Sequence, residues 1–349
     1  MARRSPISHD AHMKQTSFAS AEFAGKKRKT RREKFLAEME TVVPWARLEA
    51  LVEPHYPRSG KVGRPPIGLS RMLRMYFLQQ WYTLADEALE DALYDSQAMR
   101  EFVGIDLSKQ NVPDATTLLK FRRLLEEHEL GAAILAEVNA HLTERGLLMR
   151  QGTVVDATII AAPSSTKNSK GERDPEMHQA KKGNEWHFGM KMHTGVDADS
   201  GLVHSVVCTA ANESDIAHAH ELLHGQERVV GADSGYTGVH KREEIAQAQE
   251  NGKLRKDIDW NIAMKPGTVR GMAEGPLKAL TQICERIKAR VRARVEHPYH
   301  VIKNLFGYRK VSYRGLDKNA ARANVHAALV NLYIARRRLG CRGIGASAA

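Results

Sequence analysis

Two acidic residues in the second half of the chain lie where a metal-dependent reaction would need them. Asp156 interrupts the apolar, β-branched run 152–160, where a lone carboxylate is costly to bury unless it is paired or bound to a metal ion. Asp233 follows the apolar run 229–232, and the Ser-Gly pair after it lets the chain turn away from a strand end. An acid at the exit of a strand points into the cleft of an open sheet. The alternative for Asp233 is an ordinary turn or capping aspartate.

A third acid, Glu296, is flanked by cations on a predicted helix. Arg292 comes one turn before Glu296 and Lys303 two turns after it, so the three side chains share one face. The alternative is a surface row of ion pairs, which stabilises a helix by only tenths of a kcal/mol. Pro298 argues against a regular helix, because proline lacks the amide donor and clashes with the preceding turn. We therefore expect something other than helix stability to fix this stretch.

Three such acids suit one particular chemistry. Phosphodiester cleavage is slow because water is a weak nucleophile and the leaving oxygen is a poor one. Two Mg²⁺ ions roughly 4 Å apart meet both difficulties, since one activates the water and the other stabilises the leaving alkoxide. Magnesium takes oxygen ligands, mostly carboxylates, water and phosphate. We expect Mn²⁺ to substitute for it.

The elements that must position these acids begin at residue 151, where the sequence becomes strand-like. The hydrophobic pattern predicts an order β-β-β-α-β-α-β-α, with an Asp-Gly hairpin turn at 197–201 and a long polar loop at 163–185. The strands are predicted at 152–160, 186–196, 202–209, 227–232 and 259–265, and the helices at 214–224, 239–249, 272–306 and 320–338. The first three strands should form a meander. Residues 151–340 are therefore predicted to be one α+β domain with a mixed sheet.

The first part of the chain reads differently. Residues 1–34 are polar and end in a basic run, which predicts a flexible basic arm. Residues 35–150 are predicted to be helical throughout, and Asp114 is placed to cap a helix. That helix carries Thr117, Lys120, Arg122 and Arg123, so we expect either a helix-turn-helix DNA reader or an ordinary bundle with a solvated basic face.

Composition favours a polyanionic partner. The 349 residues contain 53 Lys and Arg against 41 Asp and Glu, a net charge of +12, and such an excess favours nucleic acid. The three cysteines are scattered and odd in number, so they form neither a disulfide framework nor a zinc motif. The sequence shows no apolar run of a signal peptide or a membrane span. We expect a cytoplasmic protein associated with the bacterial nucleoid, with no membrane partner.

Histidines are dense between residues 186 and 221, which raises the question of a zinc site. Their spacing disfavours it, because two lie on a strand face and the last two are only two residues apart on a helix. Lys191 and His193 are instead expected to face the cleft or DNA. The histidines weighed here are His187, His193, His204, His218 and His220.

Several motifs together resemble a known family. The spacing of Arg292, Glu296 and Lys303 looks like the C-terminal signature of the IS4 and IS5 group of insertion-sequence transposases of the DDE type. The runs 295–298, 301–303, 306–308 and 313–316 are similar to the IS5 family in particular. So are the runs 155–158 and 231–236, and the segments 81–82 and 87–95 resemble its N-terminal region.

The resemblance covers nearly the whole chain from about residue 14 and implies an RNase H-like fold preceded by an all-α domain. It implies that Asp156, Asp233 and Glu296 form the catalytic, metal-binding triad, and that Arg292 and Lys303 contact the transposon end. The protein would then bind the terminal inverted repeats of its element, cut at the ends and join the freed 3′-hydroxyl to target DNA, as a homodimer on DNA. One departure is Ala289, where the broader pattern has tyrosine.

Two other functions share part of this evidence. A stand-alone RNase H-like nuclease would have the same three acids but no need of a large helical domain to read DNA ends. A DNA-binding regulator without chemistry would have no need of three acids at converging positions.

Overall fold

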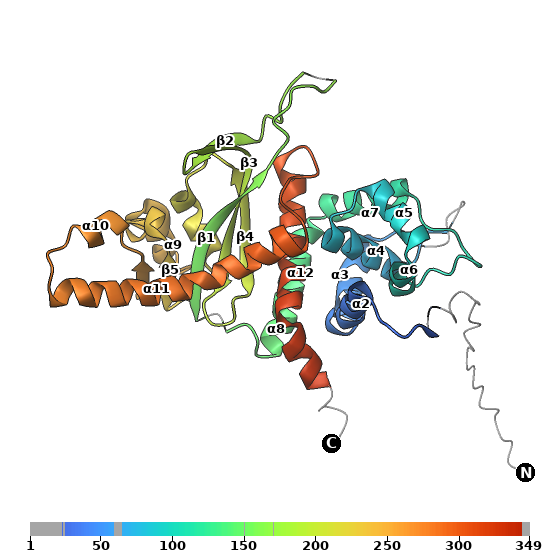
Figure 1. The fold of residues 1–349 in the computed structure, drawn as a ribbon, viewed down its shortest axis with the longest axis horizontal. Coiled ribbons are helices and arrows are strands. Elements are labelled where there is room, and N and C mark those ends of the chain that lie inside the picture. The colour runs from blue at the N-terminus through green and yellow to red at the C-terminus, as the bar shows by residue number, and fades with distance from the viewer. Residues whose placement is uncertain (1–22, 24, 59–64, 150, 170, 344–349) are drawn as a thin grey trace, which may run out of the picture.

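The computed structural model describes residues 23, 25–58, 65–149, 151–169 and 171–343. Helices of the first half lie on one side, a mixed sheet lies on the other, and the last long helix runs between them (Figure 1). No helix within these described ranges is long and apolar enough to cross a membrane.

The first half is helical, as the sequence predicts. Asp114 caps α7 through its Oδ1, which accepts a hydrogen bond from the Thr117 amide at 2.7 Å. Helix α2 begins inside the predicted basic arm, because Thr30 and Glu33 form a capping box there. Residues 1–22 and 24 of that arm lie outside the described residues. The helices are α2 (Arg31–Val42), α3 (Trp45–Val52), η1 (Glu53–His55), α4 (Leu69–Tyr82), α5 (Asp86–Asp95), α6 (Gln97–Val103), α7 (Ala115–Glu127) and α8 (Leu130–Glu144).

The second half forms a six-stranded mixed sheet. Strand β3 lies between β1 and β4 and is antiparallel to both, whereas β1, β5 and β6 are parallel neighbours. A meander followed by parallel strands is the arrangement of an RNase H-like fold. The strands are β1 (Gly152–Ala161), β2 (His178–Lys182), β3 (Glu185–Asp197), β4 (Val203–Ala210), β5 (Val229–Ala232) and β6 (Asp259–Ile262).

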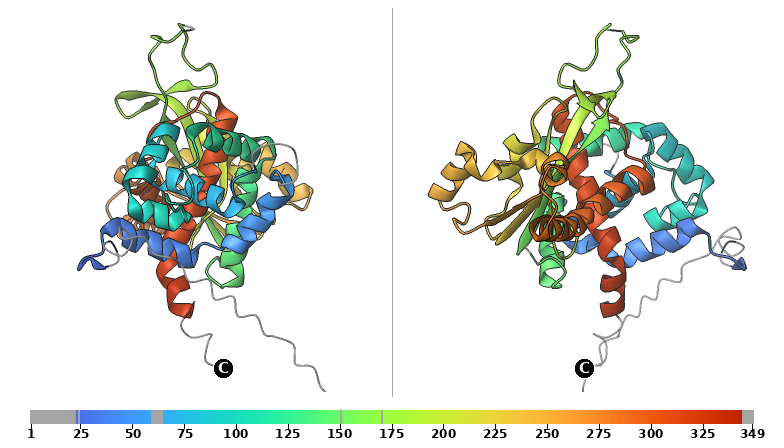
Figure 2. Two further views of the ribbon diagram at one scale, coloured as in Figure 1. Left: turned by 90° about the vertical axis from the view of Figure 1, so that its right-hand side faces the viewer. Right: turned by 60° about the vertical axis from the view of Figure 1, so that its left-hand side comes forward.

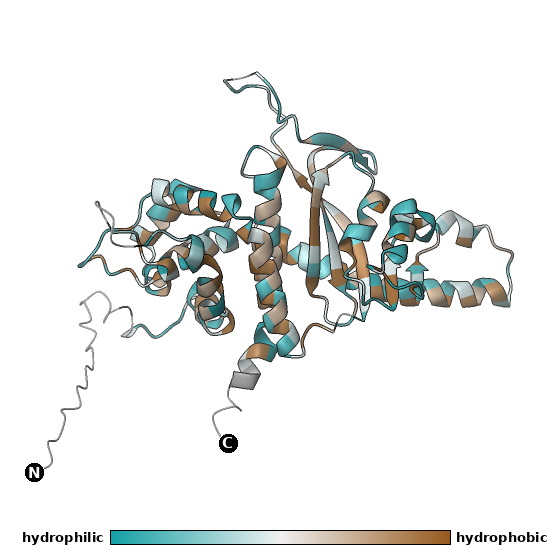
Figure 3. Ribbon diagram, turned by 180° about the vertical axis from the view of Figure 1, so that it is seen from behind, coloured by the Kyte–Doolittle hydropathy of each residue, from teal (hydrophilic) through white to brown (hydrophobic). Residues whose placement is uncertain are grey.

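Helices cover both faces of this sheet. Parts of α11 (Pro276–His300) and α12 (Leu316–Gly343) pack on one face, together with α8. The other face is covered by η2 (Asp215–Leu222), η4 (Val239–Lys241) and α9 (Glu243–Glu250). Apolar positions run along the central strands and α12, where these layers meet (Figure 3). The remaining short elements are η3 (Ser234–Tyr236), α10 (Pro266–Arg270) and the π-helix η5 (Val301–Leu305).

Two segments differ from the sequence-based expectation. The predicted loop 163–185 contains β2, which pairs with the first residues of β3 as a hairpin at the sheet edge. The segment 214–224, predicted as an α-helix, is the 3₁₀-helix η2. This tighter helix packs against β3, β4 and β1.

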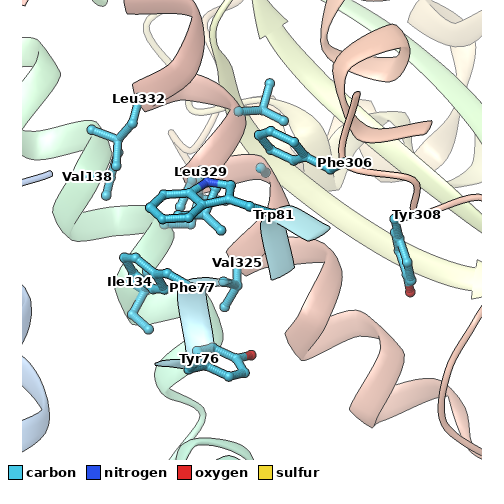
Figure 4. Packing of buried hydrophobic residues seen from close by; sticks show 14 of the residues in the cluster. Tyr76, Phe77, Trp81, Ile134, Val138, Phe306, Tyr308, Val325, Leu329 and Leu332 are labelled. Atoms are coloured by element: carbon cyan, nitrogen blue, oxygen red, sulfur yellow. The ribbon is translucent and has the colours of Figure 1, made fainter. Parts of the chain in front are cut away.

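The buried core does not stop at the predicted boundary near residue 150. Trp81 of α4, Ile134 of α8, Leu329 of α12 and Phe306 belong to one apolar cluster (Figure 4). The right-hand view of Figure 2 shows α12, in red, between the sheet and the N-terminal helices. The Thr83 hydroxyl also donates a hydrogen bond to the Phe306 carbonyl. The helical half and the sheet are therefore held together by apolar packing on α12.

Candidate active site

Asp156 and Asp233 lie at equivalent positions on two neighbouring parallel strands. The last register pair of β1 and β5 is Val154 with Gly231, and each acid follows its strand's member by two residues. Asp233 keeps an extended backbone, with φ −77° and ψ 177°. Because adjacent strands lie about 4.8 Å apart and residues two apart share a face, both carboxylates are directed to the same side of the sheet.

Glu296 approaches this pair from α11, which crosses the sheet beside β1 and β5. Tyr299, one turn later, is buried and fixes the crossing. Its hydroxyl donates to the Asp156 carbonyl at 2.9 Å and lies 2.7 Å from the Thr194 hydroxyl of β3. This contact joins the helix that carries Glu296 to the strand that carries Asp156.

The local electrostatics show that the three acids influence one another. The pKa of Asp156 is raised to about 6, mainly by burial and also by the nearby carboxylates of Asp233 and Glu296, whereas the Ala157 amide and Arg292 oppose the shift. The Ala157 amide donates to the Asp156 carboxylate at 2.8 Å. The Gly235 amide holds Asp233 in the same way, at 2.8 Å. Negative charge is thus concentrated at Asp156 and is only partly offset by Arg292, as in a site that binds metal ions.

The donor set fits divalent ions with oxygen ligands. The three acids do not bring one ligand atom each within 4.8 Å of the other two, since among described residues only a histidine-rich cluster elsewhere does so. Magnesium does not require three protein ligand atoms so close together, because it is usually bound by one or two carboxylates together with water and substrate phosphate. Asp156, Asp233 and Glu296 are therefore the residues that would hold the ions.

A cleft of about 730 Å³ opens next to Glu296, and five of its eleven lining residues are lysine, arginine or histidine. Lys303 lines it, and its ammonium group donates to the Thr158 hydroxyl at 2.7 Å and to the Ile159 carbonyl at 2.8 Å. Burial lowers the pKa of Lys303. The other basic side chains of the cleft are Lys182, His187, His300 and Arg309. A phosphate group entering this cleft would meet several cations beside the acids.

Pro298 changes the helix as the sequence suggests. The α-helix continues through Pro298 to His300 and then widens into the π-helix η5, which contains Lys303. Pro298 is buried, so apolar packing stabilises this stretch although the proline supplies no amide donor. Within the π-helix, Lys303 contacts Thr158 of β1.

Arg122 was expected at a DNA-contacting surface, and the structure corrects this. Its guanidinium is only 6% exposed, forms a two-pronged ion pair with Asp86 at 2.7 and 3.0 Å, and lies over the ring of Tyr313. Arg122 falls on the buried stripe of α7, four residues after Leu118. Its neighbours Lys120 and Arg123 are exposed.

His193 was likewise expected to face the cleft or DNA, but it is fully buried beneath η2. Its Nε2 lies 2.9 Å from the Thr209 hydroxyl, and burial lowers its pKa to about 4, so the ring is neutral at pH 7. Lys191 is half-buried, and its ammonium group pairs with Asp215 at 2.8 Å and donates to the Glu213 carbonyl. Both side chains stabilise the packing of η2 on the sheet.

Sequence reasoning missed Tyr299 and Thr158. Tyr299 follows Glu296 by three residues, and Thr158 follows Asp156 by two, so each lies on the same face as its acid. That spacing could have indicated that both residues lie at the site. Ala289, where the resembling pattern has tyrosine, is exposed on α11.

Comparison with known families agrees with this geometry. The family model described as Transposase DDE domain matches residues 148–332, just over half of the chain. A second model, described as Transposase domain (DUF772), matches residues 24–124. The chain therefore belongs to the family of transposases with a DDE domain. It is a DNA transposase, and its fold is RNase H-like with a helical N-terminal region.

Among solved structures, the chain is similar to the cryo-EM structure of a piggyBac transposase synaptic complex with hairpin DNA. The two share 10% sequence identity with a TM-score of 0.44, and the match covers 87% of this chain and 73% of that one. This distant likeness adds nothing to the assignment.

Proposed function

We propose that this transposase binds the terminal inverted repeats of its own insertion sequence, of the IS5 family, cleaves the phosphodiester at the element ends and joins the 3′-hydroxyl to target DNA. One observation supports this most: Asp156 and Asp233 lie side by side on parallel strands, and Glu296 is near enough to raise the pKa of Asp156. Such a set of carboxylates suits two Mg²⁺ ions, with Mn²⁺ able to replace them.

The metal ions, when bound, would supply an activated nucleophile and charge stabilisation at the cut phosphodiester. The chain's own residues do the positioning. Asp156 is held by the Ala157 amide and Asp233 by the Gly235 amide, so both carboxylates have fixed orientations. Tyr299 keeps Glu296 on the same side through its bond to the Asp156 carbonyl. Two of the three ammonium donors of Lys303 bind β1, which leaves one N–H for a phosphate oxygen in the cleft.

The DNA partners are double-stranded element ends and target DNA. We assign Arg292 and Lys303 to the DNA near the cut, and the exposed Lys120 and Arg123 of α7 to DNA further away. Lys191 is a weaker candidate, because Asp215 already neutralises it. Since two element ends must be paired, the protein acts as a homodimer on DNA, in the cytoplasm at the nucleoid.

The test uses linear DNA that carries the gene's own flanks, incubated with the full chain and Mg²⁺. The proposal expects a 3′-hydroxyl at the element boundary, followed by joined products when target DNA is added. Nicks scattered along the DNA would indicate a nuclease without end recognition. Specific binding with neither nicking nor joining would contradict the proposed reaction and favour a regulator.

A further inference from the structure

A second group of metal-ligand side chains lies on the other face of the sheet. His204 belongs to β4, His224 follows η2, and Glu227 precedes β5. One ligand atom from each of the three lies within 4.8 Å of the other two. Their neighbour on β1 is Thr153, three residues before Asp156 and therefore on the opposite face.

Glu227 is fixed in place before any ion arrives. Its side chain is fully buried, and its two carboxylate oxygens accept the amides of His224 and Gly225, each at 2.7 Å. The Thr153 hydroxyl donates to the same oxygen, Oε1, at 3.2 Å. That oxygen lies 3.3 Å from Nε2 of His224. A buried, fixed carboxylate facing an imidazole is preorganised for a cation.

His204 is also held in one orientation. The ring lies across Gly195 of β3, where a Cβ atom would come within 2.7 Å of the ring carbon Cε1. Its Nδ1 is 2.8 Å from the Ser205 hydroxyl, so Nε2 faces Thr153 at 3.0 Å and the cluster beyond. A hydrogen bond at the second ring nitrogen is how proteins commonly orient a metal-binding histidine. The two histidine rings meet edge to face, with centroids 4.8 Å apart.

We propose that His204 Nε2, His224 Nε2 and Glu227 Oε1 bind one Zn²⁺ ion, with water or the Thr153 hydroxyl in the fourth position. Tetrahedral zinc with bonds of about 2.1 Å separates its ligand atoms by roughly 3.4 Å. Nε2 of His224 and Oε1 of Glu227 are 3.3 Å apart, close to that value. The Thr153 hydroxyl lies 3.2 Å from Oε1 of Glu227 and 3.0 Å from Nε2 of His204, so it is near enough for the fourth position. Two imidazoles and one carboxylate favour zinc over magnesium, so this site differs in preference from the three acids.

Binding has one local consequence that can be observed. The Gln226 amide donates to Nδ1 of His224 at 3.2 Å, which places the ring proton on Nε2. Zinc at Nε2 displaces that proton to Nδ1, so the Gln226 contact must break. The ion would tie β4, the segment after η2 and the entry to β5 together. Because β5 ends at Asp233, the site stabilises the frame of the active site without taking part in the reaction.

The experiment is a zinc titration of the chelator-treated full chain by calorimetry in excess Mg²⁺, in an Asp156→Asn, Asp233→Asn, Glu296→Gln background that removes the three acids. We expect one Zn²⁺ per chain and a melting temperature that rises with zinc concentration. His204→Ala and His224→Ala should abolish both effects. His240→Ala removes an exposed histidine outside the cluster and should change neither.

A third variant, Glu227→Gln, removes the charge but keeps one acceptor, because the amide oxygen can still accept the His224 amide while the Gly225 amide loses its acceptor. It should fold, by circular dichroism, and lose zinc binding. Absence of zinc binding by the parent protein, or equal binding by the folded cluster variants and His240→Ala, would overturn the proposal. Because cleavage is not measured, neither result depends on the proposed transposition reaction.

Discussion

The hydroxyl of Tyr299 donates a hydrogen bond to the backbone carbonyl of Asp156, 2.9 Å away. This bond connects the helix α11 to the central strand β1. The two elements must keep a fixed relative position if Glu296 is to act together with the two aspartates. The same hydroxyl meets Thr194 of β3 at 2.7 Å, so one buried group fixes the helix against two strands. Tyr299 is therefore a positioning residue for Glu296.

Replacing Tyr299 by Phe tests this role. The change removes one donor to the Asp156 carbonyl and leaves the buried Thr194 hydroxyl without its partner, which costs roughly 1–3 kcal/mol in the free energy of unfolding. DNA cleavage should also slow, with DNA affinity little changed. The matched control is Tyr308→Phe, because Tyr308 is equally buried and its hydroxyl has no hydrogen-bond partner among the described residues. Equal behaviour of the two variants in denaturation and cleavage would contradict the assignment.

The raised pKa of Asp156 predicts a pH dependence of stability in the absence of metal. The folded protein holds the Asp156 proton to about pH 6, whereas the unfolded chain loses it near the ordinary value of 3.8. The folded state therefore binds more protons between these values, and stability falls as pH rises from about 4 to about 6. Asp156→Asn should remove this loss and stabilise the metal-free protein above pH 6, by at most roughly 3 kcal/mol because solvent reaches part of the side chain.

Urea denaturation in chelator at several pH values measures this difference. Asp95→Asn, at an exposed position, serves as the control and should show no such pH trend. If the advantage of Asp156→Asn were constant from pH 4 to pH 7, ionised Asp156 would not be the source of the instability. Added Mg²⁺ should reverse the order above pH 6, because only the carboxylate binds the ion.

Arg122 and Arg123 are adjacent but should behave oppositely. Arg122→Ala leaves Asp86 without its buried partner and removes a cation from Tyr313, at a cost of roughly 3 kcal/mol in stability. Arg123→Ala, at an exposed position on α7, should leave stability unchanged and weaken DNA binding. Thermal melting measures the stability of both variants, and DNA-binding titrations measure their affinity for DNA. A stable Arg122→Ala protein with weak DNA binding would restore the surface role that the structure rejects.

Lys303 should act through a phosphate. Lys303→Ala is expected to weaken binding of the element ends and to lower the slope of log affinity against log salt by about 1. Lys253→Ala changes an exposed lysine outside the cleft and should leave that slope as it is. An unchanged slope for both variants would mean that Lys303 serves only to hold η5 on β1 through Thr158 and Ile159.

The three acids and the strands near them could be predicted from the sequence because the patterns that indicate them are local. Asp156 and Asp233 stand in or after apolar runs, and the spacing around Glu296 is a motif. The bond from Tyr299 to Asp156 joins residues 143 positions apart, and no local pattern reports such a pair. The meeting of His204 with His224 and Glu227 is equally hidden, since it needs the turn from η2 into β5.

The two wrong predictions of DNA-contacting residues have a common physical cause. Arg122 and His193 are polar residues that looked exposed, and each is buried because a distant element covers it. Asp86 of α5 neutralises Arg122, and η2 covers His193. The helical period places Arg122 with Leu118 and Phe121 on the buried face of α7, so its burial could have been predicted from the sequence. Its ion-pair partner could not have been predicted in this way.

The central claim is that Asp156, Asp233 and Glu296 act as one metal-holding unit. The most direct test is cleavage of DNA carrying the element ends in Mg²⁺, with Asp156→Asn, Asp233→Asn and Glu296→Gln compared singly, and with Glu213→Gln as an exposed control. The account predicts that each of the three variants still binds the DNA ends but loses cleavage, while the control cleaves normally. Normal cleavage by a folded variant of any one of the three acids would contradict it.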